Sequence, residues 1–253
     1  MIKNELSVEL ISENEVKLII ESINYSKEQY KNHVKREKLV TQNGKYHEIW
    51  NYIFTNIENS FNEFPYKSYK ISRGSLWAFV AIHDHKNSIL YVIMKENTFK
   101  TIKKSKDKDL HYIKILNLIN PFRKEKNKQL SLFPEDKSKE EYIKNDLEQM
   151  LKDIDGKVKA CVDILFSEKQ NRVTSISGNI FDYDLDEIKS YCWNKFITAD
   201  INEITDTDDE YEVINKPIEL FVRKHVKRME EYEKDTEDII ASKETQKKNF
   251  EEK

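Results

Sequence analysis

Two neighbouring apolar runs, residues 76–82 (LWAFVAI) and 89–94 (ILYVIM), decide the fold. In both runs successive residues are apolar, so side chains on both faces of an extended chain must be covered. Short apolar runs bounded by polar turns are typical of buried strands. The connection from His83 to Ser88 is polar and predicts a turn. We therefore expect two central strands of one sheet, joined by that turn.

Helical spacing and strand alternation predict the elements around these strands. The N-terminal part (residues 1–62) should hold helices that start at the caps Ser12 and Ser26, and a third helix over 45–61. An edge strand is expected over 66–72. The remaining expected elements are a helix over 112–119, a helix over 138–154, a half-buried strand over 158–166, a strand over 172–180 and a helix over 184–197.

The predicted fold class is α+β: an antiparallel sheet of hairpins flanked by helices, with a long C-terminal helix. We expect residues 1–205 to form this single domain, with an exposed peptide loop at 121–137. Five acidic residues between 206 and 212 predict an acidic linker over 206–216. A charged helix with a weak apolar face is expected over 217–253.

Composition limits the compartment and the kind of partner. The 253 residues include 43 basic and 46 acidic ones, and the net charge of −3 excludes an overall basic coat for nucleic acid. No apolar run approaches the ~18 residues that a membrane span needs, so we expect a cytoplasmic protein with no membrane partner. Cys161 and Cys192 lie in apolar segments without metal-ligand spacing, and we expect both to be buried free thiols.

The residues Gln129, Leu130, Ser131, Leu132 and Phe133 place three large apolar side chains in a polar connection. Their order resembles the short peptide with which many bacterial DNA-handling proteins bind the replication sliding clamp: glutamine, leucine, a small or acidic residue, leucine and phenylalanine. The resemblance implies that Leu132 and Phe133 fill an apolar pocket of the clamp (its beta subunit), while Gln129 fixes the register. Alternatively, the three apolar side chains pack on the protein's own core.

Two basic runs are candidates for contact with DNA phosphate. Arg123 and Lys124 precede the peptide, and the second run lies on the expected C-terminal helix. The second run comprises Arg223, Lys224, Lys227 and Arg228. Runs of this kind are more often the solvated face of a helix.

The histidines near the predicted turn are candidate metal ligands. His83 and His85 would lie on one face of an extended chain, with Asp84 on the other and His111 as a further nitrogen ligand. Their spacing fits no tight metal-binding motif, and histidines in a turn are usually surface residues. We therefore assign no metal and no cofactor.

A metal-dependent nuclease or other nucleic-acid enzyme is an alternative function, because a protein whose partner is bound to DNA could act on that DNA. Asp84 and Lys95 are the residues suited to it, but a restriction-type site needs an acid two residues before the lysine, where this chain has Ile93. No phosphate-cradling glycine-rich loop and no nucleophile motif occurs in the sequence. The catalytic residues of such an enzyme stay unassigned.

Three segments resemble an uncharacterised bacterial family from low-GC Gram-positive species and their mobile elements. They are Ser-Arg-Gly-Ser-Leu-Trp at 72–77, Leu-Tyr-Val-Ile-Met at 90–94 and Leu-Ser-Leu-Phe-Pro at 130–134. The resemblance implies a toxin–antitoxin or phage-conflict role. The first hypothesis is thus a protein that docks on the sliding clamp and inhibits replication or is localised to DNA. A third is a non-catalytic interaction module whose C-terminal helix binds a cognate antitoxin or another protein.

Overall fold

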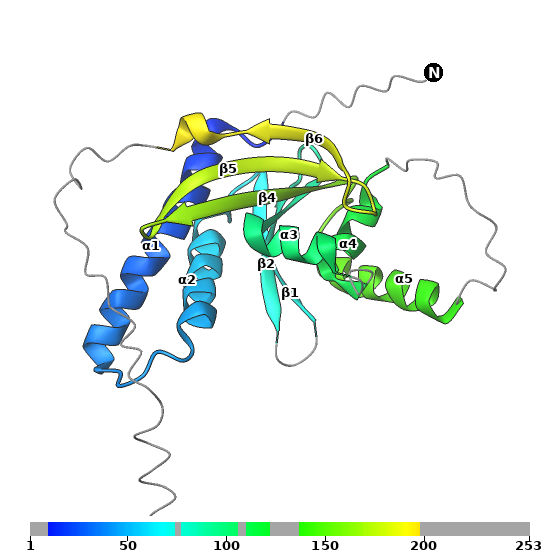
Figure 1. Ribbon diagram of the computed structural model, residues 1–253. Coiled ribbons are helices and arrows are strands. Elements are labelled where there is room, and N and C mark those ends of the chain that lie inside the picture. Colours follow the sequence, from blue (N-terminus) through cyan, green and yellow to red (C-terminus); the bar gives the residue numbers. More distant parts are fainter. Residues whose placement is uncertain (1–9, 74–76, 106–109, 122–136, 198–253) are drawn as a thin grey trace, which may run out of the picture. The chain divides into compact units, whose positions relative to one another are not determined.

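The computed structural model describes residues 10–73, 77–105, 110–121 and 137–197 (Figure 1), all within one unit of the chain, residues 1–199. Its elements in chain order are α1 (Glu13–Glu37), α2 (Lys45–Ser60), β1 (Tyr66–Ser72), β2 (Ala78–Asp84), β3 (Ile89–Lys95), α3 (Glu96–Lys104), α4 (Tyr112–Leu116), η2 (Asn117–Ile119), α5 (Lys137–Leu151), β4 (Ala160–Lys169), β5 (Arg172–Phe181), β6 (Glu187–Cys192) and η3 (Asn194–Phe196). The expected linker (206–216) and C-terminal helix (217–253) lie outside the described residues.

The described strands form a six-stranded sheet in the order β1-β2-β3-β4-β5-β6. Neighbouring strands are antiparallel except β3 and β4, which run parallel with Ile89 opposite Ala160 and Lys95 opposite Phe166. The expectation of an antiparallel sheet built of hairpins fails at this pair. The cause is the connection, because α3, α4, η2 and α5 intervene and a crossover of this kind brings the chain back parallel.

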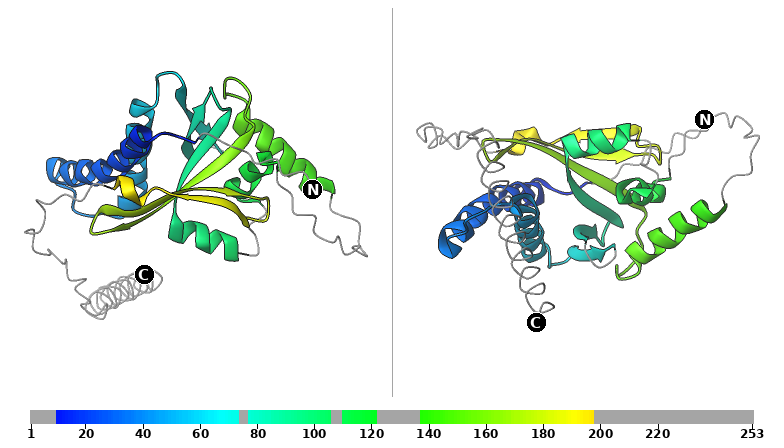
Figure 2. Two further views of the ribbon diagram at one scale, coloured as in Figure 1. Left: turned by 90° about the horizontal axis from the view of Figure 1, so that it is seen from above. Right: turned by 60° about the horizontal axis from the view of Figure 1, so that its bottom comes forward.

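Helices cover both faces of this sheet (Figures 1 and 2). On one face α1 and α2 pack over strand residues such as Tyr91 and Ile164. On the other face α3, α4 and α5 pack over residues such as Leu90 and Leu165. β2 and β3 are therefore buried on both sides, as the two apolar runs predicted. β4 is also buried on both faces over most of its length, so its prediction as a half-buried strand is wrong.

The N-terminal segment forms one long helix, α1, where two helices were expected. Ser12 is its N-cap, as predicted, but Ser26 lies inside it and donates its hydroxyl to the carbonyl of Ile23 at 2.6 Å. A serine that bonds back to its own helix does not interrupt it. Ile19 and Ile23 are fully buried in the interface with α2, which matches the predicted helix over 45–61.

The expected helix over 184–197 is wrong: this segment is a tight turn followed by the strand β6 and the short η3. A carboxylate oxygen of Asp182 accepts the backbone N–H groups of Asp184 and Asp186 at 3.0 and 2.9 Å, and Leu185 has a positive φ of 65°. These acids thus form a turn instead of capping a helix. Cys192 ends the strand and is exposed, contrary to expectation, whereas Cys161 in β4 is buried.

The helix α3 was not expected from the sequence. Only Phe99 and Ile102 bury its apolar side, while its charged residues include the i,i+4 pair Glu96–Lys100. Two apolar positions are too few to give a clear helical period. None of the described helices combines the length and apolar character that crossing a membrane requires.

Candidate functional site

A cleft of about 940 Å³ lies where α2 meets the ends of β1 and β3 and the start of β2. Its aromatic lining residues are Tyr46, Trp50, Phe54, Trp77 and Tyr112. Its basic and imidazole residues are His47, Lys70, Arg73, Lys95 and His111. The others are Asn51, Ser72, Ala78, Ile93, Met94 and Thr98. The described lining therefore contains no carboxylate, although acids outnumber bases in the whole chain.

The aromatic residues come from two groups. Tyr46, Trp50 and Phe54 recur every four residues along α2 and so lie on one side of that helix, with the rings of Trp50 and Phe54 centred 5.1 Å apart. The second group is Trp77 and Tyr112, whose rings are centred 4.8 Å apart. Tyr46 and Trp77 are 71% and 41% exposed, so part of each side chain is accessible to a ligand.

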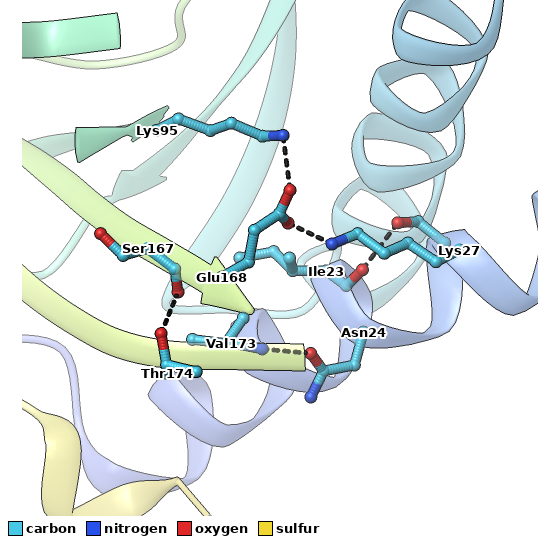
Figure 3. A network of polar contacts seen from close by, with 9 residues as sticks. Ile23, Asn24, Lys27, Lys95, Ser167, Glu168, Val173 and Thr174 are labelled. Atoms are coloured by element: carbon cyan, nitrogen blue, oxygen red, sulfur yellow. Dashed lines mark hydrogen bonds and ion pairs between the residues drawn. The ribbon is translucent and has the colours of Figure 1, made fainter. Parts of the chain in front are cut away.

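Lys95 joins the cleft to a network of charged side chains (Figure 3). Its ammonium lies 2.6 Å from one carboxylate oxygen of Glu168, and the buried Lys27 of α1 binds the other oxygen. The same ammonium lies 6.0 Å from the ring centre of Tyr46. The network holds two lysines against one glutamate and therefore carries one unbalanced positive charge at the edge of the cleft.

The pKa shifts in this network follow from burial and pairing. Burial lowers the pKa of Lys27, and the charges of Lys95 and Lys45 act in the same direction against the pull of Glu168. Burial acts to raise the pKa of Glu168, but hydrogen bonds from Lys27 and Lys95 hold that pKa below its usual range. Pairing with Glu168 therefore opposes the loss of charge on Lys27 that burial favours.

Arg73 and His111 form the other polar end of the cleft. Arg73 is paired with Asp146 of α5, and both side chains are mostly buried. His111 is the N-cap of α4 and accepts the backbone N–H of Ile113 through Nδ1 at 3.3 Å. Burial and the charge of Arg73 lower the pKa of His111 to about 4, so the imidazole is neutral at pH 7. A neutral ring and a paired guanidinium can donate or accept hydrogen bonds but add little net charge.

The residues assigned from the sequence to partner binding lie outside the described residues. This applies to the peptide Gln129, Leu130, Ser131, Leu132 and Phe133. It applies equally to both basic runs, Arg123 and Lys124, and Arg223, Lys224, Lys227 and Arg228. The assignments stay predictions.

The predicted histidine pair does come together, but not in an exposed turn. The rings of His83 and His85 are centred 4.5 Å apart, and His83 is only 1% exposed. Burial, followed by the charge of His85, lowers the pKa of His83. His111 lies apart from them in the cleft. Among the described residues, no three histidine, cysteine, aspartate or glutamate side chains are placed to share a metal ion.

Asp84 and Lys95 do not meet. Asp84 is buried opposite Ile89, at the start of β3, whereas Lys95 ends the same strand. Six residues of extended chain separate these ends by about 20 Å. Asp84 instead accepts the backbone and side-chain amides of Asn87 at 3.0 and 2.7 Å, which closes the turn. The described geometry therefore gives no support to a nuclease site built from this pair.

A buried polar cluster under η2 was not predicted as a unit. Asp163 of β4 is fully buried, and the side-chain amide of Asn117 donates to it at 2.8 Å. Burial raises the pKa of Asp163 to about 7, against the hydrogen bonds from Asn117 and Cys161. Asn120 ties this cluster to the sheet, since it bonds the carbonyls of Cys161 and Phe181. The cluster is enclosed by protein, which suits it to holding η2 on the sheet.

The fold and cleft define an α+β protein with a cleft lined by aromatic and basic side chains. The chain belongs to the Family of unknown function (DUF5986), whose model matches residues 8–242. No curated protein and no solved structure matches the chain. The resemblance to an uncharacterised family is thereby confirmed at the level of a family without known function.

Proposed function

We propose that this protein binds the bacterial DNA sliding clamp through the peptide from Gln129 to Phe133. The observation that carries the proposal is the agreement of all five positions with the clamp-binding pattern. In a chain of this length such a match arises by chance roughly once in several hundred sequences. Leu132 and Phe133 are the anchors, because large apolar side chains dominate the affinity of small interfaces.

The length and the endpoints of the connection support this assignment. Residues 122–136 join η2 to α5, two helices that cover the same face of the sheet. The median connection in a compact domain has about 4–6 residues, and much longer ones usually either serve a function or act as linkers. A long connection between neighbouring helices is a suitable carrier for a peptide that another protein binds.

Clamp binding has two possible consequences, and both fit a cytoplasmic protein. Occupying the clamp's peptide pocket would exclude replicative partners, which requires no catalytic group in this chain. Recruitment to the clamp would instead place the protein on DNA. A role in toxin–antitoxin systems or phage conflict agrees with the first of these. A five-residue anchor alone predicts an affinity in the micromolar range or weaker.

A competition experiment tests whether the peptide is the contact. The full chain is bound to purified bacterial sliding clamp, and a synthetic peptide of residues 126–136 is added. The proposal predicts that this peptide displaces the chain, while a scrambled peptide of the same composition does not. A complex that survives a large excess of the peptide would place the contact in another part of the chain.

A further inference from the structure

The cleft near α2 has a lining that the clamp proposal does not explain. Acids make up 46 of the 253 residues, so sixteen residues drawn at random would include about three. The described lining of the cleft includes none. The volume of about 940 Å³ lies at the upper end of the range of small-molecule sites. The cleft is therefore large enough for a ligand and selective for one that is not cationic.

The positive charge of the cleft is placed so that a ligand can reach it. Lys70 is exposed on β1, and no carboxylate among the described residues pairs with it. Lys95 adds the unbalanced charge of its network with Lys27 and Glu168. Glu168 lies outside the cleft lining, so its carboxylate holds the Lys95 ammonium without entering the cleft. An anionic group such as phosphate is the chemistry that matches two lysines.

The aromatic residues select for planar rings beside that anion. The side chains of Tyr46 and Trp77 are accessible to solvent, and Trp50 continues the aromatic row along α2. Nucleobases stack on such rings with little dependence on base identity. Phosphate-binding lysines interleaved with exposed aromatic rings are the arrangement that binds single-stranded nucleic acid. A purely apolar ligand would leave the positive charge of Lys70 without a match in the cleft.

We propose that this cleft binds nucleoside phosphates, with nucleobases stacked on the rings of Tyr46 and Trp77 and phosphates held by Lys70 and Lys95. A free nucleotide and a short single strand both present this chemistry. No described lining residue belongs to the clamp peptide, so the variants that test the two proposals are separate. The two proposals can therefore fail independently.

The full chain is titrated with two kinds of probe. Fluorescein-labelled dT12 and rU12 are followed by fluorescence anisotropy, and unlabelled AMP and ATP by intrinsic tryptophan fluorescence. Two of the three tryptophans, Trp50 and Trp77, line the cleft and should be quenched when a base stacks. Binding of the strands alone identifies single-stranded nucleic acid as the ligand, and binding of AMP or ATP alone identifies free nucleotide. Either result supports the proposal.

The variant Tyr46→Ala/Lys70→Ala tests the location. Both side chains are exposed, so the substitution should leave folding intact, which a melting curve verifies. We expect affinity to fall about tenfold or more, since one stacking ring and one phosphate contact are lost. The matched control Tyr25→Ala/Lys152→Ala removes one exposed ring and one exposed lysine elsewhere and should change affinity by less than about twofold.

Two results would overturn the proposal. The first is the absence of both anisotropy change and quenching for every probe up to about 1 mM. The second is an equal loss of affinity in the cleft variant and its control, which would show general attraction to the charged surface. Raising the salt concentration should also weaken strand binding, because phosphate contacts release counterions.

Discussion

The ammonium of Lys95 and a carboxylate oxygen of Glu168 lie 2.6 Å apart, at the ends of the two parallel strands β3 and β4. The other oxygen of Glu168 binds Lys27, so one carboxylate joins two strands to α1 (Figure 3). Lys27 is only 6% exposed, and a buried ammonium without a partner costs stability. Glu168 therefore has a structural role in addition to positioning Lys95.

Glu168→Gln should destabilise the fold. The variant keeps the shape of the side chain but leaves Lys27 without a countercharge. Breaking a buried pair costs about 3–5 kcal/mol, and the partial exposure of Glu168 and Lys95 places the expected loss near 2–3 kcal/mol. Denaturant unfolding at neutral pH measures it. The control Glu13→Gln breaks an exposed i,i+4 pair with Lys17 and should cost no more than about 0.5 kcal/mol. Similar losses in the two variants would show that the network contributes little.

Asp163→Asn should change how stability depends on pH. The folded state raises the pKa of Asp163 to about 7 from an ordinary value near 3.8. Between these two pH values the folded protein therefore holds a proton that the unfolded chain has lost. This group's contribution to stability is therefore fully present below pH 3.8 and is lost as the pH rises to about 7. The loss is of the order of 4 kcal/mol.

The amide that Asp163→Asn introduces resembles the protonated acid and does not titrate. We expect the variant to be more stable than the wild type above pH 7 and nearly equal to it at pH 4. Melting temperatures measured from pH 4 to 8 check this. A wild type and variant with parallel pH profiles would contradict the buried, protonated state of Asp163.

Gly178→Ala should destabilise the junction of β5 and β6. The ring of Trp193 lies directly over the Cα of Gly178, so an added methyl group would collide with it. Trp193 is 6% exposed, so its displacement would open the edge of the core. Overpacking of this kind costs about 1–3 kcal/mol. Gly44→Ala is the control, because no non-neighbouring atom lies within 4 Å of the added methyl group. Since Gly44 is the N-cap of α2, this replacement should cost no more than about 1 kcal/mol. Equal unfolding midpoints for the two variants would refute the contact.

The sequence predicted the elements whose apolar pattern is long and regular. α2 and β1 lie within a few residues of the expected ranges, because their apolar residues recur with one clear period. β2 and β3 were found because each is an uninterrupted apolar run, and β5 also lies close to its expected range. The prediction of a helix over 184–197 was wrong because Leu185, Ile188 and Tyr191 satisfy a helical spacing. The aspartate-rich turn that contains Leu185 instead leads into the hairpin of β5 and β6. The parallel pairing of β3 with β4 depends on tertiary packing of the crossover, which local periodicity does not report.

The cleft could not be predicted from the sequence, because its lining residues are far apart in the chain. Its lining comes from several helices and strands and the segments between them, spread from residue 46 to residue 112. The sequence around each side chain accounts for it without a binding role: Trp50 continues the apolar side of α2, and Lys95 ends a strand. Only the fold brings the ammonium of Lys95 to 6.0 Å from the ring centre of Tyr46. The clamp peptide is the opposite case, since its signal is contiguous in sequence.

The measurement that tests the clamp proposal most directly is the affinity of the full chain for purified bacterial sliding clamp, wild type against Leu132→Ala/Phe133→Ala. We expect wild-type binding in the micromolar range and at least a tenfold loss in the double variant. The control Leu39→Ala/Val40→Ala removes two apolar side chains that are 42% and 98% exposed, and it should bind like the wild type. A wild type that does not bind at about 1 mM, or a double variant that binds equally well, would contradict the account.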